Sequence, residues 1–131
     1  MSEPLWLSRV QVEAIHDDQL HEHGGLAGLR DPGALESALA RPLNVFLHSK
    51  CDLADLAAAY AHGIVKNHPF NDGNKRTAFA VAAVFLDLNH VEITMTEAEA
   101  TLRMLELTDS SISEKQFAEF LRKNTRKLKR K

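Results

Sequence analysis

The stretch NKRTAFAVAAVFLDL, residues 74 to 88, decides the fold. From Ala78 to Leu86 it is apolar at every position, and Asp87 ends the run. A membrane-spanning helix needs about 20 such residues, so this run is too short to cross a bilayer. Because it is apolar on every side, the pattern indicates a buried central helix over residues 74–88, with Asn89 at its C-cap.

The segment before it carries the signals of a second long helix. Asp52, with Asp55 three residues later, forms a capping pattern that predicts a helix from Leu53 to about Asn67. Pro69 disfavours helical backbone at His68, so the helix must end there.

Two helices are predicted nearer the N-terminus. Ser8 and Gln11 form a capping box for a helix that reaches about Leu20 and is followed by glycine-rich residues 24–28. Asp31-Pro32 then predicts the start of a short helix over residues 34–41.

Pro42 is expected to stop that short helix. Residues 43–50 have no helical caps and are expected to form a loop or a short hairpin. Phe46 and His48 lie there, in what is expected from the residues alone to be a plain connection.

In the C-terminal part, residues 91–95 alternate between apolar and polar side chains, which predicts one extended segment. Thr96 with Glu99, and Ser113 with Gln116, then open two further helices. We therefore expect an all-α fold: a single domain over residues 1–131, with about six helices around helix 74–88.

Composition supports one ordinary globular domain, with 131 residues, 44% hydrophobic and 26% charged. One cysteine excludes an internal disulfide and a Cys-based zinc ribbon. The first residues lack a signal-peptide pattern, so we expect a soluble, cytoplasmic protein without a membrane partner. A net charge of −2 provides no global field for nucleic acid.

From about Arg122 onward the chain is basic and has no acidic residue. Cations suit the negative end of a helix dipole, so we expect a fraying C-terminal helix. A patch that contacts an acidic partner or RNA is the alternative.

Residues 68 to 76, HPFNDGNKR, form a tight loop that leads into the N-terminus of helix 74–88. Such an end presents unpaired N–H groups and partial positive charge, which bind anions. Gly73 lets the backbone turn sharply and approach a ligand, and Lys75 and Arg76 add two cations. The G-x-x-x-x-G-K-[ST] pattern of a Walker loop is absent.

Two further side chains complete a reactive combination. His68 supplies a general base, and Asp72 is a hard oxygen ligand suited to Mg²⁺ shared with phosphates. Together with the anion site they indicate phosphoryl or nucleotidyl transfer. Phe70 is expected to hold the loop against the core.

The other histidines are expected to be structural. His16, His21 and His23 do not form H-E-x-x-H and no cysteine supports them, so a metal site is the less favoured alternative. His62 is expected to make a polar contact in the core.

The stretch from His68 to Arg76 resembles the H-x-F-x-[D/E]-G-N-x-R motif of the Fic/Doc superfamily. It is more similar to the Doc (death-on-curing) branch, which comprises toxins of type II toxin–antitoxin modules. The similarity extends over about residues 8–108, including residues 15–17, 24–28 and 31–33. It implies that the segment with Phe46 and His48 is a flap that aligns the target peptide, as the alternative to a plain connection.

The resemblance implies ATP and Mg²⁺ as cofactors and a role for each loop residue. His68 would deprotonate a target hydroxyl and Asp72 would hold Mg²⁺. Gly73 and Asn74 would cradle the phosphate with backbone and amide groups. Lys75 and Arg76 would neutralise the phosphate charge. Phe70 would be a further nucleotide-binding residue.

AMP-transferring Fic enzymes have glycine where this chain has Lys75, and a second arginine where it has Phe79. Doc also has lysine there, which implies a flipped ATP whose γ-phosphate faces the target. The product would be a phosphothreonine on elongation factor Tu, and translation would stop. Transfer of AMP, UMP or phosphocholine is the alternative on the same scaffold.

The chain lacks the [S/T]-x-x-x-E-[G/N] inhibitory helix of many Fic proteins, because no glutamate is followed by glycine or asparagine. Inhibition would then come in trans from a Phd-like antitoxin that is disordered until bound. DNA would be reached only through that antitoxin. A non-catalytic, antitoxin-binding co-repressor is a further alternative.

Overall fold

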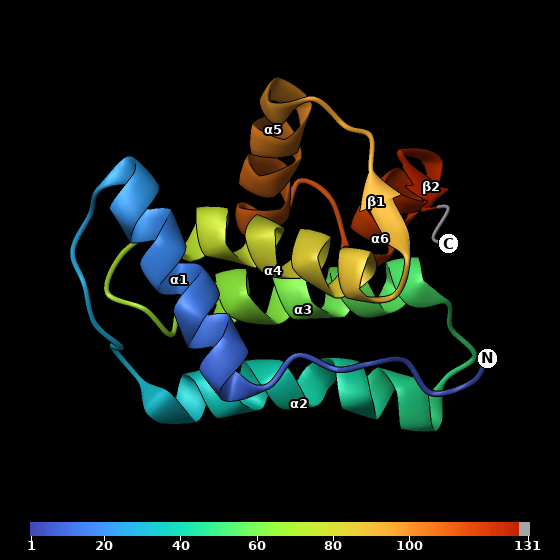
Figure 1. Ribbon diagram of the computed structural model, residues 1–131, viewed down its shortest axis with the longest axis horizontal. Coiled ribbons are helices and arrows are strands. Elements are labelled where there is room, and N and C mark those ends of the chain that lie inside the picture. The colour runs from blue at the N-terminus through green and yellow to red at the C-terminus, as the bar shows by residue number, and fades with distance from the viewer. Residues whose placement is uncertain (129–131) are drawn as a thin grey trace.

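The computed structural model describes residues 1–128, which form six helices and one pair of short strands (Figure 1). The all-α fold is therefore confirmed. None of these helices is long and apolar enough to span a membrane. The elements are α1 (Arg9–His23), α2 (Pro32–His48), α3 (Leu53–Asn67), α4 (Asn74–Leu88), β1 (Val91–Ile93), α5 (Glu97–Thr108), α6 (Glu114–Lys123) and β2 (Thr125–Lys127).

The predicted helix starts are confirmed by their caps. In α1, α3 and α6 the N-cap side chain accepts from the N3 backbone, and the N3 side chain accepts from the N-cap backbone. The side chain of Thr96 likewise accepts from the backbone of Glu99. These reciprocal bonds satisfy donors that a helix would otherwise leave unpaired.

The most buried helix is α3 rather than α4. Two-thirds of α3, including all of residues 56–61, is buried between α2, α4 and α6. Helix α4 packs one face on α3 but leaves Phe79 and Ala80 half-buried and Val84 40% exposed. Phe79 and Ala80 line an open groove beside α5, which the sequence does not reveal.

The prediction that Pro42 ends the second helix is wrong, because α2 continues to His48 with Pro42 buried inside it. A proline lacks the N–H that would bond the carbonyl four residues earlier, here that of Ala38. That carbonyl lies against α3 at Gly63, where an added Cβ would be 3.1 Å from the Ala38 oxygen. Close packing of the two helices compensates for the missing bond.

Residues 43–48 are consequently helical rather than a loop, a hairpin, a flap or a plain connection. The N-terminal segment packs over this part of α2, where the Trp6 ring lies 5.6 Å from the Phe46 ring and 6.0 Å from the Phe85 ring. Burial in this aromatic cluster stabilises the helical conformation of residues 43–48, although their own sequence carries no capping signals.

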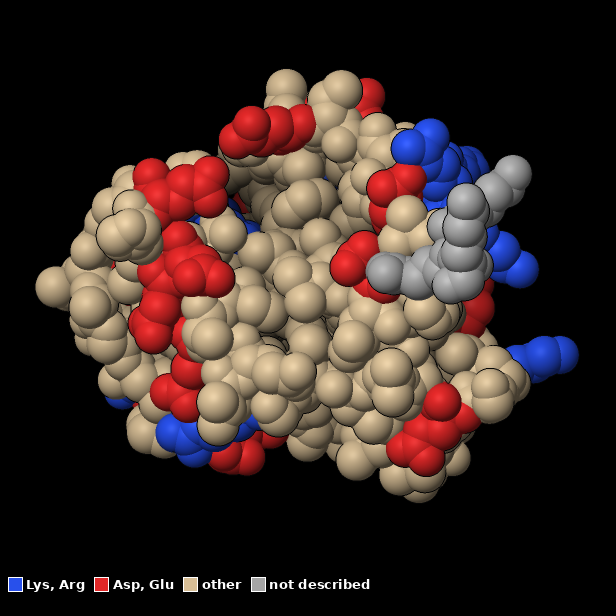
Figure 2. All heavy atoms as spheres, in the orientation of Figure 1, with Lys and Arg blue, Asp and Glu red and all other residues tan. Residues whose placement is uncertain are grey.

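The C-terminal segment also differs from the predicted fraying helix. Helix α6 ends at Lys123, and Thr125–Lys127 pairs antiparallel with Val91–Ile93, which confirms the extended segment there. Arg122 bonds the carboxylates of Asp52, the N-cap of α3, and of Asp55 in its first turn. Figure 2 shows basic side chains gathered beside β2 and α6; the rest of the predicted basic tail, residues 129–131, lies outside the described residues.

We expect Gly63→Ala to lower the free energy of unfolding by about 1–3 kcal/mol, because the new methyl would meet the backbone of Ala38 at 3.1 Å. Gly33→Ala in the same α2–α3 layer is the control, since its Cβ would meet only the Asp31 carboxylate at 3.4 Å. Urea denaturation of both variants measures the difference. A Gly63→Ala protein as stable as the Gly33→Ala protein would contradict the close approach.

Candidate functional site

The reactive loop, residues 68–73, joins the C-terminus of α3 to the N-terminus of α4. Left-handed backbone occurs at both of its ends, at His68 (φ 54°) and at Gly73 (φ 77°). The loop and the first turn of α4 line a cavity of about 270 Å³. Its lining residues are His68, Asn71, Asp72, Gly73, Asn74, Lys75 and Arg76.

The connection between α1 and α2 holds this loop along its length. Leu29 forms a β-bridge with Phe70, and Asn71 donates its backbone N–H to the Gly28 carbonyl at 3.0 Å. The Asn71 side chain donates to the Ala27 carbonyl at 3.1 Å. At Gly28 (φ 112°) an added Cβ would be 2.7 Å from the Asn71 amide nitrogen, so glycine is required there.

Asp72 links the two loops through its carboxylate. One oxygen accepts from the Leu26 backbone at 3.0 Å and the other from the Gly73 backbone at 2.8 Å. These two bonds, with smaller effects of the Arg76 and His16 charges, lower the pKa of Asp72 below its ordinary value. The side chain remains exposed, and each oxygen keeps a lone pair that is free for a cation.

Two residues that we assigned to nucleotide binding are buried and make contacts within the protein. Phe70 is 1% exposed, and its ring stacks on the His16 ring at a centroid distance of 3.8 Å. The buried Asn74 amide accepts from the Phe70 N–H at 3.0 Å and donates to the Phe70 carbonyl at 2.9 Å. The expected packing of Phe70 against the core is therefore confirmed. Asn74 lines the loop cavity while its amide is bonded within the loop. A contact of either residue with a nucleotide stays a prediction.

The reactive side chains that the site exposes to solvent are those of His68, Asp72, Lys75 and Arg76. The first intrahelical bond of α4 runs from the Thr77 N–H to the Gly73 carbonyl. The N–H groups before Thr77 precede that bond and lie at the positive end of the helix dipole. The arrangement can therefore bind an anion beside a histidine.

Two structural residues support the loop from outside it. His16 is 3% exposed and its Nε2 lies 2.8 Å from the Asp72 carbonyl, which confirms a structural role. Arg30, which the sequence analysis missed, donates from Nε to the His68 carbonyl at 2.6 Å. No local pattern marks Arg30, because its partner is 38 residues away.

His62 makes the predicted polar contact. Its Nδ1 lies 3.1 Å from the Glu114 carboxylate, which Arg41 also binds. Burial lowers the pKa of His62. The contact joins α3 to α6, away from the residues that line the reactive loop's cavity.

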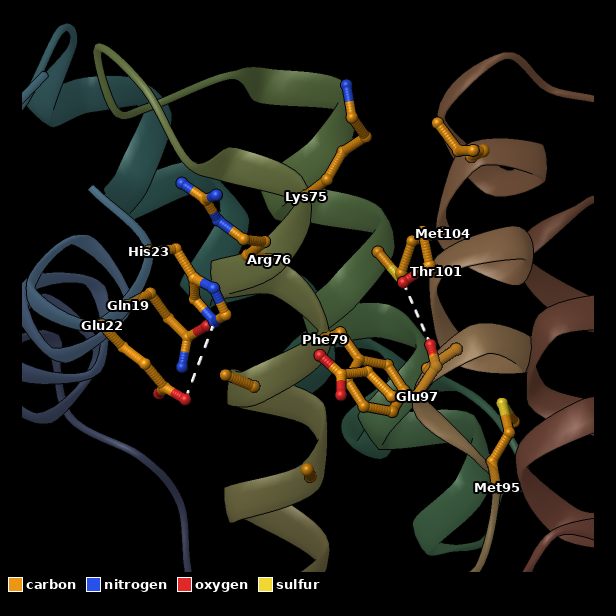
Figure 3. Close-up of a pocket in the computed structure, with 14 residues that line it drawn as sticks. Gln19, Glu22, His23, Lys75, Arg76, Phe79, Met95, Glu97, Thr101 and Met104 are labelled. Atoms are coloured by element: carbon orange, nitrogen blue, oxygen red, sulfur yellow. Dashed lines mark hydrogen bonds and ion pairs between the residues drawn. The ribbon is translucent and has the colours of Figure 1, made fainter. Parts of the chain in front are cut away.

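A larger groove of about 680 Å³ lies between α1, α4 and α5, and Lys75 and Arg76 line it as well (Figure 3). Figure 2 shows the surface hollowed between α1 and α5. Glu22 and Glu97 lie at its two sides, and Phe79 is at its floor. The other apolar lining residues are Ala80, Ala83, Met95, Ala100, Met104 and Leu105.

We expect the amide proton resonances of Leu26 and Gly73 to titrate together on acidification, with a midpoint below the ordinary pKa of an aspartate carboxyl. A carboxylate with a lowered pKa keeps its hydrogen bonds above its ordinary pKa and loses them as pH falls through the lowered value. NMR titration measures this.

Asp72→Asn should abolish both transitions. The Ser111 amide, which donates to Asp109 at 2.8 Å, should still titrate in that variant. Independent midpoints for Leu26 and Gly73 would contradict a shared carboxylate.

Comparisons with known proteins agree with this geometry. The model of the Fic/DOC family matches residues 6–86. The chain is 36% identical over 88 residues to the protein named protein kinase doc of Escherichia phage P1, covering 66% of this chain and 70% of that protein. It is 43% identical over 72 residues to the toxin Doc of Mycolicibacterium smegmatis, covering 53% of this chain and 55% of that protein. The match includes the reactive loop and the connection that holds it, and the chain belongs to the Fic/DOC family.

Proposed function

We propose that this protein is the toxin of a toxin–antitoxin module and transfers the γ-phosphate of ATP to a threonine hydroxyl of elongation factor Tu. It would act in the cytoplasm and arrest translation. The observation that carries the proposal is one cavity lined by an exposed histidine, an exposed carboxylate and the cationic first turn of α4. Relatives named protein kinase doc and toxin Doc support the class of activity.

In this reaction His68 takes the proton of the threonine hydroxyl. The hydroxyl oxygen bonds to the γ-phosphorus while the bond to the bridging oxygen breaks, and ADP leaves. The backbone N–H groups of α4 and the cations of Lys75 and Arg76 face the phosphate charge. Magnesium would be held by Asp72 with phosphate and water oxygens, which matches its preference for few carboxylates, and would neutralise the nucleotide.

Lys75 is the residue that favours phosphate over AMP transfer. It is exposed in the first turn of α4 and lines both the loop cavity and the groove. A lysine amine there adds a mobile charge close to the N–H groups that would bind phosphate, in the place where AMP-transferring relatives have glycine. The terminal phosphate is therefore the group we expect to lie beside His68.

The groove between α1, α4 and α5 suits the antitoxin. Its apolar floor and charged sides fit an amphipathic helix that folds on binding. Because Lys75 and Arg76 lie at its boundary with the loop cavity, an occupant would approach the site directly. A Phd-like antitoxin is the partner we propose.

We expect the protein to transfer label from γ-labelled ATP, and none from α-labelled ATP, to elongation factor Tu. His68→Ala should reduce transfer by roughly 100-fold or more, because the base is lost. Mass spectrometry identifies the threonine, and His90→Ala is the matched control, with left-handed backbone but outside the cavity. Transfer of the α label would favour the AMP alternative, and full toxicity of His68→Ala would favour the co-repressor.

We expect expression of the chain alone to arrest growth and co-expression of its antitoxin to restore it. Ala83→Arg places a charge in the groove and should keep toxicity while losing rescue. Val84→Arg is the control, because Val84 neighbours Ala83 but is not among the residues that line the groove. A growth assay with and without the antitoxin measures the rescue of each variant. Rescue of both variants would exclude this groove as the antitoxin-binding surface.

A further inference from the structure

We propose that Arg30 is a positioning residue that fixes the orientation of His68. The inference deepens the proposed function and rests on it, because it states what holds the proposed general base, His68, in its orientation. Arg30 lies in the connection between α1 and α2 and is exposed. It bonds to the C-terminal end of α3 across the surface.

The contacts of Arg30 fall on both sides of His68. Its Nη2 donates to the Asn67 carbonyl at 2.9 Å, and its Nε donates to the His68 carbonyl at 2.6 Å. These carbonyls belong to the two peptide groups that flank His68. Rotation of the first changes φ of His68 and rotation of the second changes ψ, so one guanidinium constrains both angles.

Backbone hydrogen bonds also connect the Arg30 segment to the reactive loop. The N–H groups of Arg30 and Asp31 both donate to the Pro69 carbonyl, at 2.7 and 3.0 Å. Asp31 also caps α2, because its carboxylate accepts from the Ala34 N–H at 3.0 Å. Arg30 is therefore held next to the loop and also next to the start of α2, which Asp31 caps.

His68 needs such a constraint because its backbone is unfavourable. A left-handed conformation crowds the Cβ of any residue except glycine, and a residue before proline favours extended backbone. Within residues 1–128 no protein group hydrogen-bonds to the His68 ring. The backbone conformation is thus what directs the ring to the cavity at the start of α4.

The chemistry of the side chain fits this role. The two carbonyls are adjacent peptide acceptors, and a guanidinium presents two parallel donors in a fixed plane. A lysine ammonium is a point charge on a flexible stem and does not impose that plane. The positive charge also suits the negative end of α3.

The test compares Arg30→Gln, Arg30→Lys and Arg30→Ala with Arg9→Gln. Arg9 is a half-exposed arginine that bonds Glu13 on α1 and Glu36 on α2, away from the reactive loop, and it serves as the control. We measure the ¹³Cα and ¹³Cβ shifts of His68 in the free protein, the melting temperature, and kcat and KM for ATP.

In Arg30→Gln we expect the His68 shifts to move toward extended values and kcat to fall roughly 10- to 100-fold. The KM for ATP should stay within about twofold, because the N-terminus of α4 is untouched. Arg30→Lys should lie between wild type and Arg30→Gln. Millimolar guanidinium should restore part of the kcat of Arg30→Ala, whereas ammonium should not.

Unchanged His68 shifts in Arg30→Gln would overturn the proposal, as would a loss of kcat that only follows the melting temperature as in Arg9→Gln. The chemical shifts are read without substrate. If wild type transfers no phosphate, the proposed function fails while the shifts still decide whether Arg30 positions His68.

Discussion

The ladder of hydrogen bonds between residues 26–31 and residues 68–72 is the constraint on which the rest of the site depends. Bonds from Arg30 and Asp31 hold its start, the Leu29–Phe70 bridge its middle, and the Asp72 carboxylate its end. Each partner lies in an irregular segment, so neither segment would have a defined shape alone. Together they give a rigid loop without a long sheet.

The hydrogen bonds of this ladder also determine which side chains of the loop make internal contacts and which are exposed to solvent. Side chains that could bind ligand by type, Phe70 and Asn74, are buried and make contacts within the protein. The exposed His68, Lys75 and Arg76 stay outside, where charge and proton transfer are chemically useful. Pre-organisation of this kind removes the ordering cost that a mobile loop would have to meet on binding.

Much of the fold could be predicted because its signals are local. The capping residues of α1, α3, α5 and α6 act within three positions, and Pro69 acts on its neighbour, so these boundaries agree with the structure. The extension of α2 past Pro42 depends on the distant Gly63, and β2 depends on a partner 34 residues away, so no local pattern shows either. In the site, the motif locates the loop, but the internal contacts of Asn74 and the contact of Arg30 are set by tertiary structure.

Lys75 and Arg76 belong to two cavities at once, and this sharing has a thermodynamic consequence. Two ligands that draw on the same pair of cations cannot bind independently. If occupation of the groove weakens an anion in the loop cavity by some factor, the anion weakens the groove's ligand by the same factor. If the proposed nucleotide and the proposed antitoxin are these two ligands, a fall in the cell's nucleotide concentration would increase the affinity for the antitoxin and a rise would decrease it, without any movement of the fold.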